Sequence, residues 1–198
     1  MMKAPVFVDV DTGVDDALAL IYLLASPEAD VIGIASTGGN VAVQQVCENN
    51  LGLLELCRTT NIPVSKGSDK TLTGPMRAPS KVHGPRGMGY AELPPTDRRL
   101  TEYDSATAWV RAAHAFPGEL VGVATGPLTN LALALRAEPA LPSLLRRLVI
   151  MAAPTTTSAT RPRSRNGTSA STPRQPPRCS RPGPSKAVMR SDCRSCAV

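Results

Sequence analysis

The chain has 198 residues, 42% of them hydrophobic, and a formal net charge of +6 at pH 7. This length allows one α/β domain, or a smaller domain followed by a segment without a core. Nine of the 22 basic residues but only one of the 16 acidic residues lie in 152–198, so that segment carries +8 and residues 1–151 carry −2. The N-terminal part therefore lacks the positive surface that binds phosphate backbones, and we expect no nucleic-acid partner.

The N-terminal segment and the cysteines give little indication of membrane targeting or of a metal or redox site. The N-terminus passes directly into a strand pattern at Pro5, and no apolar run approaches the ~18 residues of a membrane helix. Cys47 and Cys57 fall in apolar helical patterns, where a small buried thiol is the usual finding. Cys193 and Cys196 form an isolated CxxC, which is weak support for a metal or redox site. We expect a cytoplasmic protein with no membrane contact.

Up to Met151, strand patterns alternate with helical patterns. Short, β-branched apolar runs predict buried strands, and apolar residues every three or four positions predict helices. The predicted strands are 5–10, 30–37, 62–65, 119–125 and 149–151. The predicted helices are 15–26, 41–60, 105–116 and a region 128–148 broken at Pro139 and Pro142. This order predicts a Rossmann-like α/β fold, with a mainly parallel sheet, helices on both faces and ligands beyond the carboxyl ends of the strands.

Two segments depart from the alternation. Residues 67–104 are rich in Gly and Pro, and so long a loop inside a compact domain usually has a function. Residues 152–198 consist mostly of Ser, Thr, Pro and Arg, with few sizeable apolar side chains. Such a composition cannot bury enough apolar surface to offset its ordering entropy. We therefore expect one domain at 1–151 and a disordered tail at 152–198.

The chemically informative segment is DVDTGVDD, residues 9–16. Asp9 and Asp11 lie on the same side of the first predicted strand, and Asp15 and Asp16 lie in the first turn of the next helix. Helix capping and the helix dipole explain one or two acidic residues there, but not four. Crowded carboxylates need a cation or shared protons to offset their repulsion, and a hard divalent cation with oxygen ligands serves this purpose. The segment predicts a metal site.

Two known families share part of this pattern. DVDT at 9–12 alone resembles the aspartyl-nucleophile motif of haloacid-dehalogenase-like phosphatases. The longer DxDxGxDDA pattern resembles the inosine–uridine nucleoside hydrolases, in which Pro commonly occupies the position of Thr12. TGGN at 37–40, HGPRGMG at 83–89 and TGPLTN at 125–130 also resemble motifs of that second family. The four motifs occur in the family's order, and the resemblance covers essentially all of residues 4–151.

The resemblance implies a calcium-dependent hydrolase that cleaves the N-glycosidic bond of ribonucleosides. Asp11, Asp16 and the Thr125 carbonyl would bind Ca²⁺, and Asp11 would also act as the catalytic base that takes a proton from water. The chemistry is coherent, because calcium lowers the pKa of a bound water and a nearby carboxylate removes its proton.

The resemblance also implies a substrate site for a small ribonucleoside. Asp15 and Asn40 would bind ribose hydroxyls, His83 would lie near the base, and Asp9 would support the site. Two of these residues also have an ordinary structural explanation. Asn40 could simply cap the helix that follows it, and His83 could be a solvated loop residue. Full-length family members are commonly homo-oligomers that act in ribonucleoside catabolism and nucleotide salvage.

Two other functions stay open on the sequence alone. A phosphotransferase would use Asp9 as nucleophile and Asp11 as acid/base with magnesium. A non-enzymatic protein would use its Arg-rich tail to bind acidic partners, with the salt sensitivity that such binding shows.

The resemblance stops near 151, because family members continue with Gly-Gly, a ribose-binding E-[WF]-N segment and a His-Asp pair that binds calcium. None of these occurs in 152–198. A shifted reading frame explains this difference. Synonymous codons at 151–154 can yield Gly-Gly-Ala, those at 165–168 Glu-Trp-Asn, and those around 171–174 Val-Asp-Pro-Glu. Without these parts we expect exposed sheet edges, exposed apolar helix faces, and impaired or absent activity.

The coding DNA tests this hypothesis directly. If residues 152–198 are a shifted-frame translation, the codons after 151 will be compatible with all three motifs in the alternative frame. Sequencing that region is the measurement, and codons that exclude any of the three motifs would contradict the frameshift.

Overall fold

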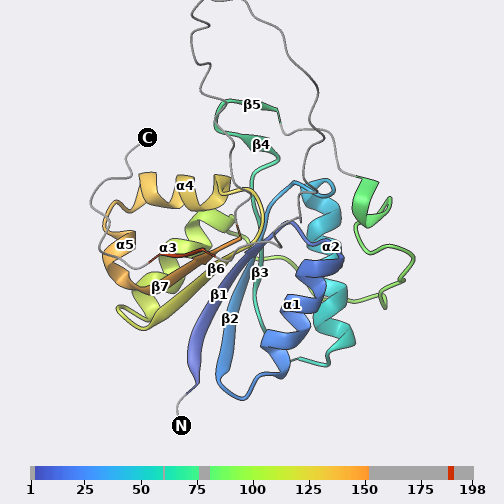
Figure 1. Ribbon diagram of the computed structural model, residues 1–198, viewed down its shortest axis with the longest axis horizontal. Coiled ribbons are helices and arrows are strands. Elements are labelled where there is room, and N and C mark those ends of the chain that lie inside the picture. Colours follow the sequence, from blue (N-terminus) through green and yellow to red (C-terminus); the bar gives the residue numbers. More distant parts are fainter. Residues whose placement is uncertain (1–2, 60, 76–80, 152–186, 190–198) are drawn as a thin grey trace, which may run out of the picture.

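The structure is a computed structural model that describes residues 3–59, 61–75, 81–151 and 187–189 (Figure 1). Its main sheet has the strand order β3-β2-β1-β6-β7-β8. The strands are β1 (Ala4–Val10), β2 (Ala29–Ser36), β3 (Val64–Lys66), β6 (Leu120–Ala124), β7 (Leu145–Ile150) and β8 (Ala187–Met189). The first five are parallel, and β8 pairs antiparallel with β7. The predicted mainly parallel α/β fold is therefore confirmed.

Helices cover both faces of the sheet, as predicted. On one face lie α1 (Val14–Ala25) and α2 (Val43–Leu56); on the other lie α3 (Ser105–Ala115), α4 (Thr129–Ala137) and α5 (Leu141–Leu144) (Figure 1). The chain runs outward from β1 to β3 and then returns past β1 to β6. Right-handed crossovers in opposite directions put their helices on opposite faces. The loops that leave β1 and β6 therefore diverge, and this switch point is where α/β proteins bind ligands.

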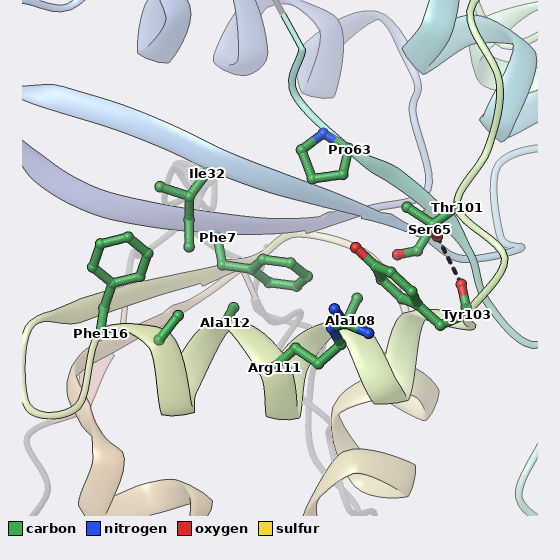
Figure 2. Close-up of a pocket in the computed structure, with 11 residues that line it drawn as sticks. Phe7, Ile32, Pro63, Ser65, Thr101, Tyr103, Ala108, Arg111, Ala112 and Phe116 are labelled. Atoms are coloured by element: carbon green, nitrogen blue, oxygen red, sulfur yellow. Dashed lines mark hydrogen bonds between the residues drawn. The ribbon is translucent and has the colours of Figure 1, made fainter.

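Two cores result, one on each face of the sheet. The α1-side core consists of Val6, Val8, Val10, Ala17, Leu20, Val31, Ile34, Leu53, Leu54 and Val64. The α3-side core consists of Phe7, Ala35, Ala108, Trp109, Ala112, Ala113, Leu120, Leu131, Ala134 and Leu141. Figure 2 shows Phe7 reaching from β1 toward α3, where its ring lies 4.7 Å from that of Trp109. The two-residue period of β1 thus directs Phe7 and Asp9 to the α3 side.

Local patterns placed some element boundaries wrongly. Residues 145–148 were expected to extend a helix, but α5 ends at Leu144 and β7 begins at Leu145. Parallel pairing of β7 with β6 outweighs the local helical preference. The helix predicted at 41–60 ends at Leu56, and the positive φ of Arg58 and Asn61 turns the chain toward β3.

The loop predicted at 67–104 contains three short elements and then packs along α2. A two-stranded hairpin joins β4 (Lys70–Thr71) to β5 (Gly74–Pro75), and a 3₁₀ turn, η1, spans Lys81–His83. Farther on, the Arg98 guanidinium lies 3.0 Å from the Glu55 carboxylate of α2. Asn49 of α2 donates to the Arg86 carbonyl at 2.8 Å. These contacts anchor the loop that carries His83.

Some predictions fall on residues outside the described ranges. The disordered tail, apart from β8, and the Cys193–Cys196 pair belong to that group. Cys47 is buried, as expected, and Cys57 is half-buried. Among the described helices, none is both long and apolar enough to cross a lipid bilayer.

Two leucines of α1 offer a matched test of the packing. Leu20 is 1% exposed in the α1-side core, whereas Leu18 is 65% exposed. Leu20→Ala should lower the free energy of unfolding by about 2–5 kcal/mol, because it leaves a cavity, and Leu18→Ala should change it by less than about 0.5 kcal/mol. Denaturant unfolding of the full chain measures both, and equal losses would contradict the assigned orientation of α1.

Candidate active site

The four carboxylates of residues 9–16 occupy three different environments. Asp11 and Asp16 are buried, at 8% and 2% exposure, and Asp9 is also buried at 2%, but Asp15 is exposed. The predicted roles also separate these residues, with Asp11 and Asp16 as cation ligands, Asp15 as a ribose contact and Asp9 as a supporting residue. Asp9 accepts a hydrogen bond from the Trp109 indole, and Asp15 points toward His83. Asp11 and Asp16 remain as the close acidic pair.

Asp11 lies at the centre of the switch point. Its Oδ2 accepts a hydrogen bond from the Asn40 N–H at 2.9 Å. Burial, and next the nearby charge of Asp16, raise the pKa of Asp11 from 3.8 to about 6. A carboxylate with this pKa is ionised at neutral pH and is a stronger base than an ordinary Asp.

Two glycines give the backbone access to Asp11. A Cβ added at Gly39 would lie 2.1 Å from Asp11 Oδ2, and one at Gly126 would lie 2.9 Å from Asp11 Oδ1. A side chain at either position would therefore press on the carboxylate. This contact gives a physical reason for the glycines of the TGGN and TGPLTN motifs.

Asp16 is the second carboxylate of the buried pair. Its Oδ2 accepts from the Gly13 N–H at 2.9 Å, which caps the start of α1, but its buried Oδ1 has no hydrogen-bond partner among the described residues. The Thr125 hydroxyl is near enough to lower the pKa of Asp16, yet it too is buried and lacks a partner with hydrogen-bond geometry. Burial is the stronger effect and raises the pKa of Asp16 overall.

The residues around this pair fit a hard cation. Two buried carboxylates, one with an unpartnered oxygen, lie beside the end of β6, where Thr125 supplies further oxygen atoms. Oxygen donors of this kind suit Ca²⁺. Within the described ranges, no three His, Cys, Asp or Glu side chains are placed to share a metal ion. Among the described residues, the close acidic pair is thus Asp11 and Asp16, with the Thr125 hydroxyl beside Asp16.

The predicted substrate residues meet around Gly13. A Cβ at Gly13 would lie 2.8 Å from the Asn40 amide nitrogen, 2.9 Å from the His83 ring and 3.0 Å from the Asp15 carboxylate. The Val14 N–H donates to His83 Nδ1 at 3.3 Å, so a neutral ring carries its proton on Nε2. That nitrogen lies 3.7 Å from Asp15 Oδ1. The fold therefore brings Asp15, Asn40 and His83 together beside Asp11.

Asp9 has partners that the sequence did not indicate. Its Oδ2 accepts from the Trp109 indole N–H at 2.8 Å, and its Oδ1 accepts from the Asn130 amide at 3.0 Å. Burial raises the pKa of Asp9 to about 7, against the lowering effect of these two donors. Asn130 belongs to the TGPLTN motif, but nothing in the sequence around Trp109 marked it.

The cavity drawn in Figure 2 is separate from this site. It has a volume of about 280 Å³ and lies between α3 and the sheet, with Phe7, Ala108 and Ala112 in its lining. The Arg111 guanidinium lies 4.5 Å from the centre of the Tyr103 ring beside it. None of the predicted site residues lines it.

A parallel α/β fold with carboxylate, amide and imidazole groups at its switch point is typical of an enzyme that acts on a small polar molecule. The sequence profile described as inosine-uridine preferring nucleoside hydrolase matches residues 6–170. The chain belongs to this family.

Individual relatives agree with the family match. The chain is 35% identical over 145 residues to uridine nucleosidase 1 of Arabidopsis thaliana, covering 73% of this chain and 43% of the relative. It is 35% identical over 150 residues to the pyrimidine-specific ribonucleoside hydrolase RihA of Salmonella arizonae, covering 76% and 48%. The chain thus spans about half the length of the curated relatives it matches.

Solved structures show the same likeness. A purine-preferring ribonucleoside hydrolase from Gardnerella vaginalis is 33% identical, with a TM-score of 0.71, and the match covers 74% of this chain and 48% of that one. An inosine-guanosine nucleoside hydrolase is 33% identical, with a TM-score of 0.72, over 80% of this chain and 52% of that one.

The raised pKa of Asp11 predicts a pH-dependent stability. Its folded pKa of about 6 exceeds the unfolded value of 3.8, so this group's contribution is complete below about pH 4 and is lost as pH rises through about 6. Without divalent cations, Asp11→Asn should therefore gain about 1–3 kcal/mol relative to the unaltered chain between pH 4 and pH 7.5.

Thermal or denaturant unfolding across this pH range makes the measurement. Asp30→Asn, an exposed carboxylate at the opposite end of β2, is the matched control and should track the unaltered chain. If the free energies of unfolding of Asp11→Asn and the unaltered chain changed in parallel with pH, the raised pKa of Asp11 would be contradicted.

Proposed function

We propose that this chain carries the cation-binding and ribose-binding part of a ribonucleoside hydrolase, which cleaves the N-glycosidic bond to free base and ribose. The observation that carries the proposal is the buried Asp11–Asp16 pair, which lies next to Asp15, Asn40 and His83 at the switch point. Membership of the family, and the names of relatives that act on uridine or other ribonucleosides, support it.

Asp11 is the proposed base. When bound by Asp11, Asp16 and the Thr125 carbonyl, calcium supplies positive charge that orients a water molecule and lowers its pKa. The hydrogen bond from the Asn40 N–H to Asp11 Oδ2 holds the carboxylate in position for this role. Asp11 is ionised at neutral pH, as both a cation ligand and a base must be.

Asp15, Asn40 and His83 are the proposed substrate contacts. The Asp15 carboxylate is exposed, with its Oδ1 3.7 Å from the His83 ring, so it is accessible to ribose hydroxyls. Cleavage of the glycosidic bond develops positive charge on the ribose ring, which the neighbouring carboxylates stabilise. Asn40 would bind a second hydroxyl, and His83 would lie on the side of the base.

The geometry disfavours the phosphotransferase alternative. A nucleophilic Asp9 would need an accessible oxygen, but Asp9 is 2% exposed and both of its oxygens accept hydrogen bonds. The alternative of a basic binding tail concerns 152–198, nearly all of which lies outside the described residues.

We further propose that the 198-residue chain is impaired as an enzyme in the cytoplasm. The described residues bring two carboxylates to the cation, and loss of a third charged ligand weakens calcium binding. Ribose would likewise be held from one side only, by Asp15 and Asn40.

Ribose release from uridine and inosine tests the proposed function on the purified full chain. Slow, calcium-dependent release that disappears in Asp11→Asn is expected, since Asp11 is both ligand and base. Saturation-transfer NMR should show calcium-dependent contact with uridine even where turnover is too slow to follow. Asp30→Asn serves as the control and should behave like the unaltered chain.

Three outcomes would contradict this account. Release at the rate of full-length relatives would contradict the impairment. Release that survives chelation or Asp11→Asn would contradict the assigned roles. Absence of both release and nucleoside contact would contradict the proposed function.

A further inference from the structure

The hydrogen bonds around Asp9 give two buried residues a role in the proposed cation site, an inference that rests on the proposed function. Trp109 is fully buried and Asn130 is 1% exposed. They donate to the two different oxygens of Asp9, at 2.8 Å and 3.0 Å. Neutral donors from α3 and α4 therefore hold this buried carboxylate in place through both of its oxygens.

Asn130 can take only one orientation. Its amide nitrogen faces two acceptors, Asp9 Oδ1 and the Ser36 carbonyl at 3.1 Å, and its oxygen accepts from the Ser68 N–H at 3.1 Å. Turning the amide over would set its oxygen against two acceptors. Gly67 leaves the space, since a Cβ there would lie 2.3 Å from Asn130 Oδ1. Asn130 thus ties the ends of β1 and β2 to the start of α4.

Packing against β6 and β1 fixes the position of the Trp109 ring. A Cβ at Gly122 of β6 would lie 2.7 Å from the indole, so the ring lies directly against that strand. The ring of Phe7, two residues before Asp9 in β1, is 4.7 Å away between centroids. The indole N–H therefore points at Asp9 from a position defined by both β1 and β6.

Both strands that carry the proposed ligands end at this network. Asp11 lies two residues beyond Asp9 in the chain, and the Thr125 N–H donates to the Asp9 carbonyl at 2.9 Å. The backbone of Asp9 is therefore linked to both Asp11 and Thr125. We propose that Trp109 and Asn130 are positioning residues for the cation site, which fix the Asp11 carboxylate relative to the Thr125 carbonyl through Asp9.

Terbium luminescence tests this proposal in the full chain. Tb³⁺ replaces Ca²⁺ at oxygen sites, and Trp109 is the only Trp in the sequence, so indole excitation reports on Tb³⁺ bound near Asp9. Asn130→Ala should weaken Tb³⁺ binding, and its competition by Ca²⁺, by about 10–100-fold, as loss of a group that orients a ligand does. Trp109→Phe lacks the luminescent donor, and calorimetric Ca²⁺ titration should show a similar loss for it.

Leu131→Ala is the control that separates positioning from general destabilisation. Leu131 is the next residue of α4 and is 5% exposed in the α3-side core, outside the hydrogen-bond network. It should lose thermal stability but keep the cation affinity of the unaltered chain. Equal weakening in Leu131→Ala and Asn130→Ala would overturn the positioning role.

The remaining outcomes are distinguishable. Binding that is lost in Asp11→Asn but unchanged in both Asn130→Ala and Trp109→Phe would overturn the positioning role and leave the proposed cation site standing. No saturable binding by the unaltered chain would overturn the cation site and the positioning role with it.

Discussion

Burial of two carboxylates, Asp11 and Asp16, at the carboxyl end of β1 is the constraint around which the site is arranged. Neither forms an ion pair with a residue that the structure describes, and burial raises the pKa of both, so the folded chain holds them at a cost in stability. The fold offsets this cost with backbone donors, from Asn40 N–H to Asp11 and from Gly13 N–H to Asp16. A bound cation would offset it further, and cation binding and stability should therefore be coupled.

The topology explains why these groups meet. Strand β1 is central, and the chain leaves β1 and β6 toward opposite faces of the sheet. Residues after these strands, such as Asp11 and Thr125, consequently face one another across the switch point. Glycines at 39 and 126 let the neighbouring loops touch Asp11, so that three strand ends converge on one carboxylate. The same topology leaves the Asp9 network directly beneath the site.

Short motifs predicted which residues surround the candidate site, and the roles assigned to those residues stay predictions. Asp11, Asn40, His83 and Thr125 stand in short motifs whose order along the chain was informative, and the alternating elements predicted the sheet. The partnership of Asp9 with Trp109 was not predictable, because it joins residues 100 positions apart and depends on how α3 packs. The helix expected at 145–148 was wrong for a related reason, since β6 supplies the pairing that makes those residues a strand. Local spacing likewise does not reveal that Asp9 finds its donors in Trp109 and Asn130.

The central claim is that Asp11 and Asp16 together bind a divalent cation in this chain. Calorimetric titration of the full chain with Ca²⁺ near neutral pH, compared with Asp16→Asn, tests it most directly. That variant replaces one Oδ of Asp16 with an amide nitrogen and so removes the charge of a carboxylate whose Oδ1 has no partner among the described residues. The account predicts saturable single-site binding that is lost in the variant. Absence of binding, or the same binding in both proteins, would contradict it.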